Sequence, residues 1–109
     1  MGTYEISRSK NGAFKWNLKA GNGEVVLSSQ MYKSKASAKK GIASVMKNSA
    51  HADRFEKKTA KNKKPFFVLK ALNGQQVGKS QFYESERSRD NGIKSVAKNG
   101  PGSKIKDLC

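Results

Sequence analysis

The sequence predicts an α+β domain built by tandem duplication, and three observations indicate this fold class. The segment LKAGNGEVVLSSQMYKS at residues 18–34 returns as LKALNGQQVGKSQFYES at residues 69–85, with a constant offset of 51. Roughly 20 of about 46 aligned residues are identical, far more than chance would give. In each copy, apolar residues alternate at strand spacing and later recur at helical spacing. We therefore predict one pseudo-two-fold domain over residues 1–109, with repeats at 1–50 and 51–109 and two helices packed on one face of an antiparallel sheet.

The first repeat begins with three predicted strands. Residues 4–8 and 14–20 alternate apolar and polar side chains, which is typical of strands with one buried face. Asn22-Gly23 is a strong hairpin signal and predicts a type I′ turn, which needs positive φ at both central residues. The chain then returns as a third strand over residues 24–28, so the repeat starts as an antiparallel meander.

A helix is predicted to follow the meander. Ser34 is a suitable N-cap, because its hydroxyl can accept a hydrogen bond from a free amide of the first turn. Ala38, Ile42 and Val45 recur at helical spacing, and Asn48 stands where the helix would end.

The second repeat copies this plan. Ser85 is predicted to cap its helix, and Gly92 occupies the place that Gly41 has in the first helix. Glycine inside a helix costs about 1 kcal/mol relative to alanine, so both positions predict a close approach of helix backbone to the sheet or to the other helix. Gly100, followed by proline, predicts a left-handed helix end, and residues 103–108 alternate loosely enough for one last strand.

Both copies carry a set of characteristic short segments. They are YEI at 4–6, FKWNLKAGNGEV at 14–25, SQMYKSK at 29–35, GIASV at 41–45, LKALNG at 69–74, SQFY at 80–83 and DNGIKSV at 90–96. These motifs resemble those of the YegP-like family of small, functionally uncharacterised bacterial proteins, here in a tandem-repeat form. The resemblance implies a β(3)-α-β unit present twice in a single antiparallel sheet, with the C-terminal strands exchanged between the units. It implies no catalytic residues, because the family has none agreed.

The chain is strongly basic, with 23 Lys and Arg against 8 Asp and Glu and a formal net charge of +15. A field of this sign attracts polyanions, here RNA or DNA or an acidic protein. The lysines concentrate in the predicted first hairpin of the second repeat and around the predicted helix of the first. The candidate polyanion contacts are Lys57, Lys58, Lys61, Lys63, Lys64, Lys33, Lys35, Lys39, Lys40 and Lys47.

Phe66 and Val68 mark a difference between the repeats. They are apolar on the face where the first copy carries Lys15 and Asn17. This face of the second copy is therefore either covered or forms a small exposed apolar contact surface at Phe66 and Val68. Most other aromatic residues fall on predicted core positions, so Phe66 is the candidate platform for stacking of nucleic-acid bases.

The sequence shows no constellation for catalysis or metal binding. One histidine, one cysteine and 8 carboxylates have no recognisable ligand spacing, so no metal and no cofactor is expected. Cys109 and His51 would make a poor nucleophilic pair, because Cys109 lies at a chain end. We therefore expect no enzymatic activity.

The expected function is that of a small, non-enzymatic, basic binding or accessory protein that contacts nucleic acid weakly and without sequence preference. Lysine lacks the bidentate fork with which arginine contacts base edges. The alternative is a protein-interaction or structural module with no nucleic-acid role, whose charge serves solubility and protects sheet edges. The sequence has no signal-peptide pattern and no membrane-spanning run, so we expect a cytoplasmic protein with no membrane partner. Because the duplication supplies both halves of the fold, we also expect a monomer.

Overall fold

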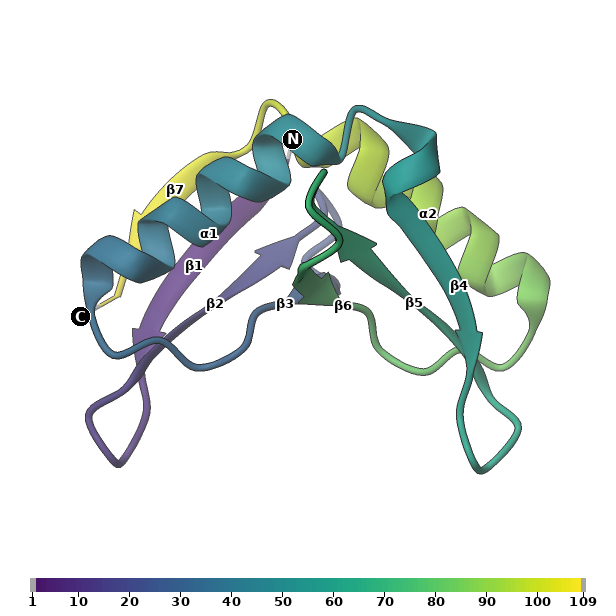
Figure 1. Cartoon of the computed structure of the whole chain (residues 1–109), viewed down its shortest axis with the longest axis horizontal. Helices are drawn as coiled ribbons and strands as arrows, with labels where there is room; N and C mark the ends of the chain where they lie inside the picture. Colours follow the sequence, from purple (N-terminus) through teal and green to yellow (C-terminus); the bar gives the residue numbers. More distant parts are fainter. Residues whose placement is uncertain (1, 109) are drawn as a thin grey trace.

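The computed structural model describes residues 2–108 and has an α+β fold with one seven-stranded sheet and two α-helices (Figure 1). All strands and helices predicted from periodicity are present. The elements in chain order are β1 (Thr3–Arg8), β2 (Phe14–Lys19), β3 (Val25–Ser28), α1 (Lys35–Asn48), the 3₁₀ turn η1 (Ala52–Arg54), β4 (Phe55–Thr59), β5 (Pro65–Lys70), β6 (Gln76–Lys79), α2 (Glu86–Asn99) and β7 (Lys104–Asp107).

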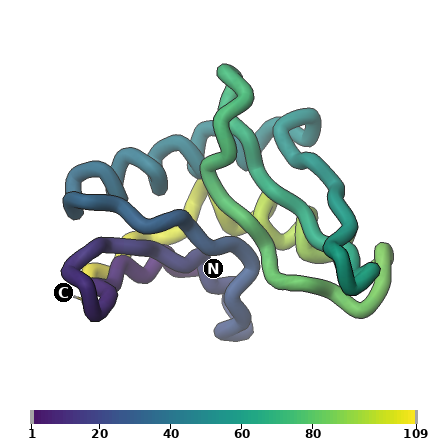
Figure 2. The backbone as a smooth tube through the Cα atoms, turned by 60° about the horizontal axis from the view of Figure 1, so that its bottom comes forward, coloured from purple at the N-terminus to yellow at the C-terminus, as the bar shows by residue number. Residues whose placement is uncertain are grey.

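The strands form a single mixed sheet in the order β4-β5-β6-β3-β2-β1-β7. Neighbouring strands pair antiparallel from β4 to β1, but β7 runs parallel to β1, with Ile105 opposite Tyr4. In Figure 2 the yellow C-terminal segment lies beside the purple N-terminal segment. The prediction of a purely antiparallel sheet is therefore wrong at this edge. The physical reason is that β7 reaches β1 through α2 instead of a hairpin, and only a hairpin forces the antiparallel direction.

The C-terminal strand crosses between the repeats in one direction only. β7 of the second repeat pairs with β1 of the first, whereas no strand within residues 2–108 pairs with the outer edge of β4. Residues 49–54 are the whole connection between α1 and β4. A C-terminal strand of the first repeat that lay parallel to β4 and led directly into it would need a crossover connection of about a dozen residues or more. The mutual exchange implied by the family resemblance is therefore replaced by a one-way exchange.

Both helices cover the same face of the sheet (Figure 1). α1 packs on β2 and also reaches β5 and β6, while α2 packs on β5 and also reaches β3, so each helix contacts strands of both repeats. The core between them includes the fully buried rings of Tyr4, Trp16 and Phe67. Since a unit of about 50 residues buries only a marginal core, the two repeats stabilise each other through this shared core.

The two mid-helix glycines have the packing role that the sequence predicts. A Cβ atom at Gly41 would collide with the Tyr32 hydroxyl, and a Cβ atom at Gly92 would collide with the Tyr83 hydroxyl. The helices also begin as predicted, because Ser34 Oγ accepts a hydrogen bond from a first-turn amide, as does its counterpart in α2.

The predicted left-handed helix end at Gly100 is wrong. Gly100 has φ −52° and ψ −52°, which is right-handed helical backbone. Its small size is instead required by a close contact, since a Cβ atom here would meet the side chain of Ser49. Ser49 and Gly100 are equivalent positions of the two repeats, and they meet where the C-terminal ends of the two helices come together.

The hairpin turns differ from the predicted type I′ geometry. In the turn after β2, Gly23 is left-handed at φ 87°, but Asn22 is not. The Gly23 amide donates to the Ala20 carbonyl at 2.9 Å, and Asn22 Oδ1 accepts from the Glu24 amide at 3.0 Å. A right-handed turn followed by one left-handed residue is a longer hairpin that adds one residue and a bulge. The left-handed positions of the four such turns are Gly12, Gly23, Lys63 and Gly74.

Candidate functional site

The ten candidate lysines lie on two separate surfaces. α1 lies on the upper side of the first repeat in Figure 1, whereas the hairpin between β4 and β5 projects from the lower side of the second repeat. The candidate lysines near the helix and those of the hairpin therefore form two groups. The hairpin group is Lys57, Lys58, Lys61, Lys63 and Lys64, and the α1 group is Lys33, Lys35, Lys39, Lys40 and Lys47.

Three of these lysines form ion pairs. Lys35 Nζ lies 2.8 Å from an Asp107 carboxylate oxygen, which ties α1 to β7. In the hairpin group, Lys57 pairs with Asp90 at 3.2 Å and Lys64 with Glu84 at 3.1 Å. Such partly exposed pairs are worth about 0–1 kcal/mol, so they reduce the local charge more than they stabilise the fold. The other hairpin lysines are exposed.

The face of the sheet opposite the helices carries an aromatic–cation cluster, which we call the Phe66 cluster: Phe66, Lys79 and Phe82. The two rings pack edge to face with centroids 5.4 Å apart. Lys79 Nζ lies 5.2 Å from the Phe66 centroid and 5.4 Å from the Phe82 centroid, within cation–π range. Phe82 is 48% exposed, which is unusual for a phenylalanine and leaves ring surface available to a ligand.

Val68 does not belong to an exposed apolar patch. It is 1% exposed, although it lies on the helix-free face. In the strand registers it stands between Glu56 of β4 and Lys79 of β6, and long polar side chains cover such positions with their aliphatic stems. The predicted apolar contact at Phe66 and Val68 is therefore corrected: Phe66 is half-buried and contacts Phe82, and Val68 is inaccessible.

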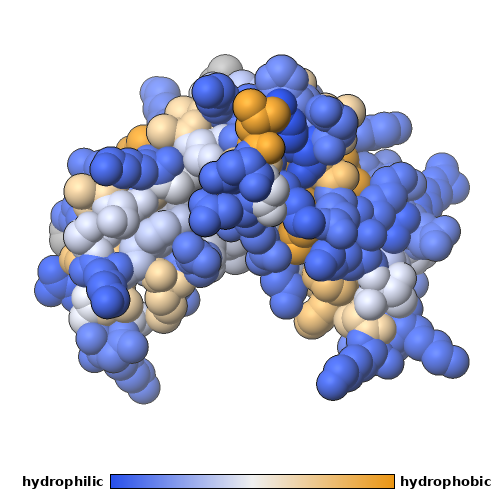
Figure 3. Space-filling view, viewed as in Figure 1, coloured by the Kyte–Doolittle hydropathy of each residue, from blue (hydrophilic) through white to orange (hydrophobic). Residues whose placement is uncertain are grey.

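Further cations lie on this helix-free face. Lys15 and Lys19 alternate with the core residues of β2, and Lys58 and Lys70 take the same face of β4 and β5. Two of these four are ion-paired, Lys19 with Glu5 at 3.0 Å and Lys70 with Glu56. The sheet is curved, with this face on its concave side between the β1–β2 and β4–β5 hairpins (Figure 1). Figure 3 shows the hollow, bordered on both sides by mainly hydrophilic residues.

Sequence reasoning missed Phe82 and Lys79. Phe82 follows β6 in an irregular segment, so no period-two pattern marks its side. A usable signal is its neighbour Tyr83, a predicted core residue, because adjacent extended residues point to opposite sides. The first repeat has Met31 at the equivalent position, 51% exposed, and Ser28 in place of Lys79. The cluster is therefore a property of the second repeat alone.

Two tyrosine hydroxyls are perturbed by burial. Burial raises the pKa of Tyr4 well above its usual range, and it raises the pKa of Tyr83. Tyr4 donates a 2.7 Å hydrogen bond to the Gly100 carbonyl, which links β1 to the end of α2. A tyrosine that stays protonated and donates to the backbone has a structural role.

Two carboxylates are perturbed in the other direction. A hydrogen bond from Lys70 lowers the pKa of Glu56, and a hydrogen bond from Lys57 lowers the pKa of Asp90. Both are salt-bridged surface groups, and within residues 2–108 no three His, Cys, Asp or Glu residues are placed to hold a metal ion. Cys109 lies outside the described residues, and His51 is exposed. No helix in the described part of the chain is long and apolar enough to cross a bilayer.

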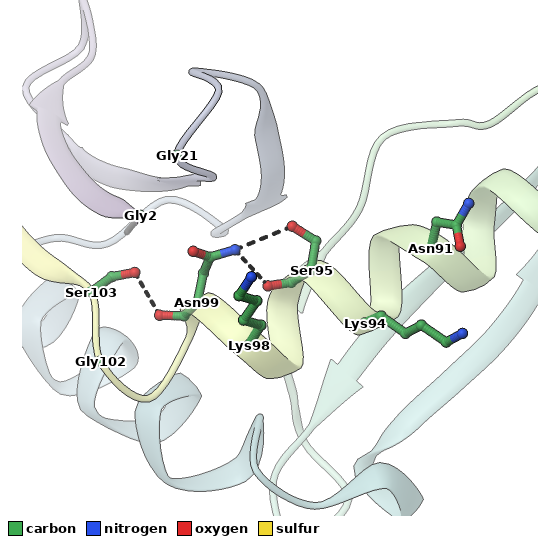
Figure 4. Close-up of a pocket in the computed structure, with 9 residues that line it drawn as sticks. All are labelled: Gly2, Gly21, Asn91, Lys94, Ser95, Lys98, Asn99, Gly102 and Ser103. Atoms are coloured by element: carbon green, nitrogen blue, oxygen red, sulfur yellow. Dashed lines mark hydrogen bonds between the residues drawn. The ribbon is translucent and has the colours of Figure 1, made fainter.

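A cavity of about 440 Å³ lies between α2 and the loops of the first repeat (Figure 4). Its polar groups mostly serve the fold. Asn99 Nδ2 donates to the Ser95 carbonyl at 2.8 Å, and Ser103 Oγ donates to the Asn99 carbonyl at 2.5 Å, so both side chains satisfy carbonyls near the end of α2. The residues that line it are Gly2, Gly21, Asn91, Lys94, Ser95, Lys98, Asn99, Gly102 and Ser103.

Comparisons with known proteins place these features in a family context. The family model described as "Domain of unknown function (DUF1508)" matches the chain twice, at residues 9–56 and 60–107. A UPF0339 protein of Acinetobacter baylyi is 58% identical over 107 residues, which cover 98% of this chain and 96% of the relative. The UPF0339 protein YegP of Escherichia coli K12 is 52% identical over 106 residues, 97% of this chain and 96% of the relative.

Two solved structures are similar over nearly the whole chain. The solution NMR structure of a UPF0339 protein from Shewanella oneidensis has a TM-score of 0.92 at 55% sequence identity, covering 98% of this chain and 91% of that one. The solution NMR structure of yegP from E. coli, described as a protein of unknown function, has a TM-score of 0.92 at 51% identity, covering 98% and 92%.

Proposed function

Since this chain belongs to the DUF1508 family, whose function is unknown, we propose its function from its own surface: it binds single-stranded nucleic acid, without sequence preference, on the helix-free face of the sheet. The observation that supports the proposal is the Phe66 cluster, which places an exposed ring and a cation side by side on a chain of net charge +15. Proteins that bind single strands combine an aromatic stacking surface with a positive groove along the backbone.

The proposed role of each side chain on the helix-free face follows from the geometry. Phe82 offers ring surface for one base, and Phe66 supports that ring from the side. Lys79 stands over both rings, so its ammonium can reach the phosphate beside a stacked base. Lys15 and Lys58 extend the positive charge along the arch toward the two hairpins. These groups bind and neutralise, and none of them is arranged for bond making or breaking, so we propose a non-enzymatic role.

The expected strength is modest. A phosphate-tracking surface of this kind binds with a dissociation constant on the order of 10⁻⁴ to 10⁻⁶ M at physiological salt. With about three or four phosphates neutralised, log K should fall with log salt with a slope of about −2 to −3 for a single strand. Fluorescence anisotropy of a labelled twelve-nucleotide single strand, titrated at several salt concentrations, measures both quantities.

Matched variants separate stacking from general attraction. Phe82→Ser should weaken binding at least about fivefold, because base–aromatic stacking is worth about 1–3 kcal/mol per base. Met31→Ser changes the equivalent position of the first repeat, outside the Phe66 cluster, and should have little effect. Lys79→Glu and Lys47→Glu alter net charge equally, but Lys47 lies on α1, on the other side of the sheet. Only Lys79→Glu should weaken binding strongly.

Three outcomes would reject the proposal. If the oligonucleotide shows no salt-dependent binding, the net positive charge of the chain serves solubility and not nucleic-acid binding. Equal losses for Lys47→Glu and Lys79→Glu would mean that net charge alone attracts the oligonucleotide. Equal affinity of the Phe82→Ser and Met31→Ser variants would remove the stacking role.

A further inference from the structure

The two edges of the sheet are unequal, although the repeats that form them are related by the duplication. At one edge β7 lies along β1, with Lys104 to Asp107 in register with Thr3 to Ile6. At the other edge, β4 has no outer neighbour within residues 2–108. Figure 1 shows this difference, with β7 beside β1 on the left and β4 as the outermost strand on the right. The molecule therefore contains one occupied and one unoccupied version of the same edge.

Side chains next to the unoccupied edge are more exposed than the equivalent side chains at the edge that carries β7. Tyr4 and Ile42 are fully buried beside β7, whereas their equivalents Phe55 and Ile93 are half-buried. A cavity of about 410 Å³ opens between β4 and α2 at this place. Its floor is apolar and its rim is charged. The lining residues are Ala52, Phe55, Lys57, Asp90, Ile93 and Lys94.

The backbone of β4 is also available for pairing. The hairpin bond from the Ala60 amide to the Lys64 carbonyl sets the phase of the β4–β5 ladder, so Lys58 and Glu56 bond to β5. The Lys57 amide and the carbonyls of Phe55 and Lys57 then point to the outer edge, whereas the Phe55 amide already donates to the Ala52 carbonyl. On the occupied edge, the Leu108 amide donates to the Ile6 carbonyl at 2.9 Å, and Ile6 is the equivalent of Lys57.

We propose that the outer edge of β4 is a docking site for an extended acidic segment of a partner protein, which adds to the sheet as a parallel strand. β7 on β1 is the template for its direction and register. The segment places an aliphatic side chain opposite Phe55, as Ile105 stands opposite Tyr4, and this side chain enters the cavity. Addition of a strand to a sheet edge takes affinity from backbone bonds and specificity from such pockets.

Charge favours an acidic partner over a second copy of this chain. β4 and its hairpin carry the five lysines of the hairpin group, and Lys94 stands on the rim of the cavity. Two copies meeting at β4 would bring these lysines together on chains that each carry +15, and like charges on adjacent strands are unfavourable. An acidic segment instead meets opposite charge at Lys58 and Lys94, and also at Lys57, whose charge Asp90 on the rim neutralises in part.

The proposal is independent of nucleic-acid binding, because it uses the strand edge and not the Phe66 cluster. A suitable probe is the capped peptide GSEIEDL, which is the sequence of residues 102–108 with both lysines changed to glutamate. The control peptide is the unchanged GSKIKDL, which has the same aliphatic residue, two lysines in place of the two glutamates, and therefore a positive net charge. NMR amide exchange and chemical shifts of the whole protein provide the readout.

The peptide should protect the amide of Lys57 from exchange, whereas those of Glu56 and Lys58 should change little, since they already bond to β5. Chemical shifts should move along β4 and at Ile93. The control peptide should bind several-fold more weakly. Lys57→Pro removes the outward amide while sparing the ladder to β5, and it should lower the affinity about tenfold. Phe82→Ser should bind the peptide normally.

Lys94→Glu is a second test in case the Lys57→Pro variant unfolds. It changes only an exposed charge on the rim of the cavity, and it should weaken peptide binding several-fold. The proposal is overturned if the Lys57 amide gains no protection at millimolar peptide, or if the shifts centre on β1 and α1. It is also overturned if Lys57→Pro, folded by its amide spectrum, binds as well as the parent chain.

Discussion

Lys63 is the residue whose substitution should stabilise this protein. It has φ 67° and is the only non-glycine residue with positive φ within residues 2–108. The equivalent turn of the first repeat has Gly12 there, at φ 82°. A left-handed backbone costs a residue with a side chain about 1–2 kcal/mol. Glycine avoids this cost but makes the unfolded chain more flexible, which offsets about 0.4–1 kcal/mol. Lys63→Gly should therefore stabilise the fold by about 0.5–1 kcal/mol.

Urea denaturation followed by circular dichroism is the assay. With an m-value of about 1.5 kcal/mol/M, the midpoint should rise by about 0.5 M with no change in slope. Removing a lysine also relieves repulsion from Lys61 and Lys64, so Lys63→Ala is the necessary comparison. Alanine removes the same charge and keeps the left-handed cost. The difference between the glycine and alanine variants isolates the backbone contribution, and it should be about 1 kcal/mol.

Gly12→Lys is the reciprocal control. No atom lies within 4 Å of a Cβ built at Gly12, so a substitution there meets no steric obstacle and reports backbone conformation alone. With the same offset from the unfolded chain, it should destabilise the fold by about 0.5–1 kcal/mol. The reasoning is refuted if Lys63→Gly is no more stable than Lys63→Ala, or if Gly12→Lys leaves the midpoint unchanged.

Three further substitutions test the packing. Gly92→Ala should destabilise by about 1–3 kcal/mol despite better helix propensity, because the new methyl collides with Tyr83; an unchanged thermal midpoint would contradict the close contact. Tyr4→Phe should cost about 1 kcal/mol at neutral pH through loss of the bond to Gly100. Because burial raises the pKa of Tyr4, the contribution of its hydroxyl to the free energy of unfolding is complete below about pH 10 and is lost as the pH rises further. The free energy of unfolding of Tyr4→Phe should therefore fall less steeply above about pH 10 than that of the parent chain. Identical alkaline profiles would show that Tyr4 does not titrate on unfolding. Trp16→Phe should lower the free energy of unfolding, measured by urea denaturation, by less than about 1.5 kcal/mol. Trp16 Nε1 is buried without a hydrogen-bond partner among the described atoms, and the second repeat has phenylalanine at the equivalent position. A loss of about 3 kcal/mol would mean that the indole has a packing role of its own.

The features that sequence reasoning predicted correctly depend on local pattern. Alternation around Trp16 and Leu18 places both in the core because neighbouring strand residues face opposite sides. Gly41 and Gly92 were interpretable because a glycine in mid-helix has a cost that packing must offset. In each case the decisive information lies within a few residues of the position itself.

The features that were missed depend on partners distant in sequence. β7 follows a loose pattern of its own, and nothing in it indicates that Ile105 will pair with Tyr4. The local pattern left open whether Val68 is covered or exposed, because the residues that flank it, Glu56 and Lys79, lie on other strands. The turn at Gly23 was assigned the wrong type because Asn-Gly fits two hairpin geometries, which differ by one bulged residue.

The differences between the two repeats follow from the unequal edges. Where both repeats have the same surroundings, their residues agree: each pairs a tyrosine with a mid-helix glycine, Tyr32 with Gly41 and Tyr83 with Gly92. Where the surroundings differ, the residues differ too. Ile6 lies on β1 beside β7 and is fully buried, whereas the side chain of its equivalent, Lys57, is 55% exposed at the open edge. The short link between α1 and β4 therefore determines more than topology, because it leaves one edge without a strand and thereby selects the charged residues that face any partner there.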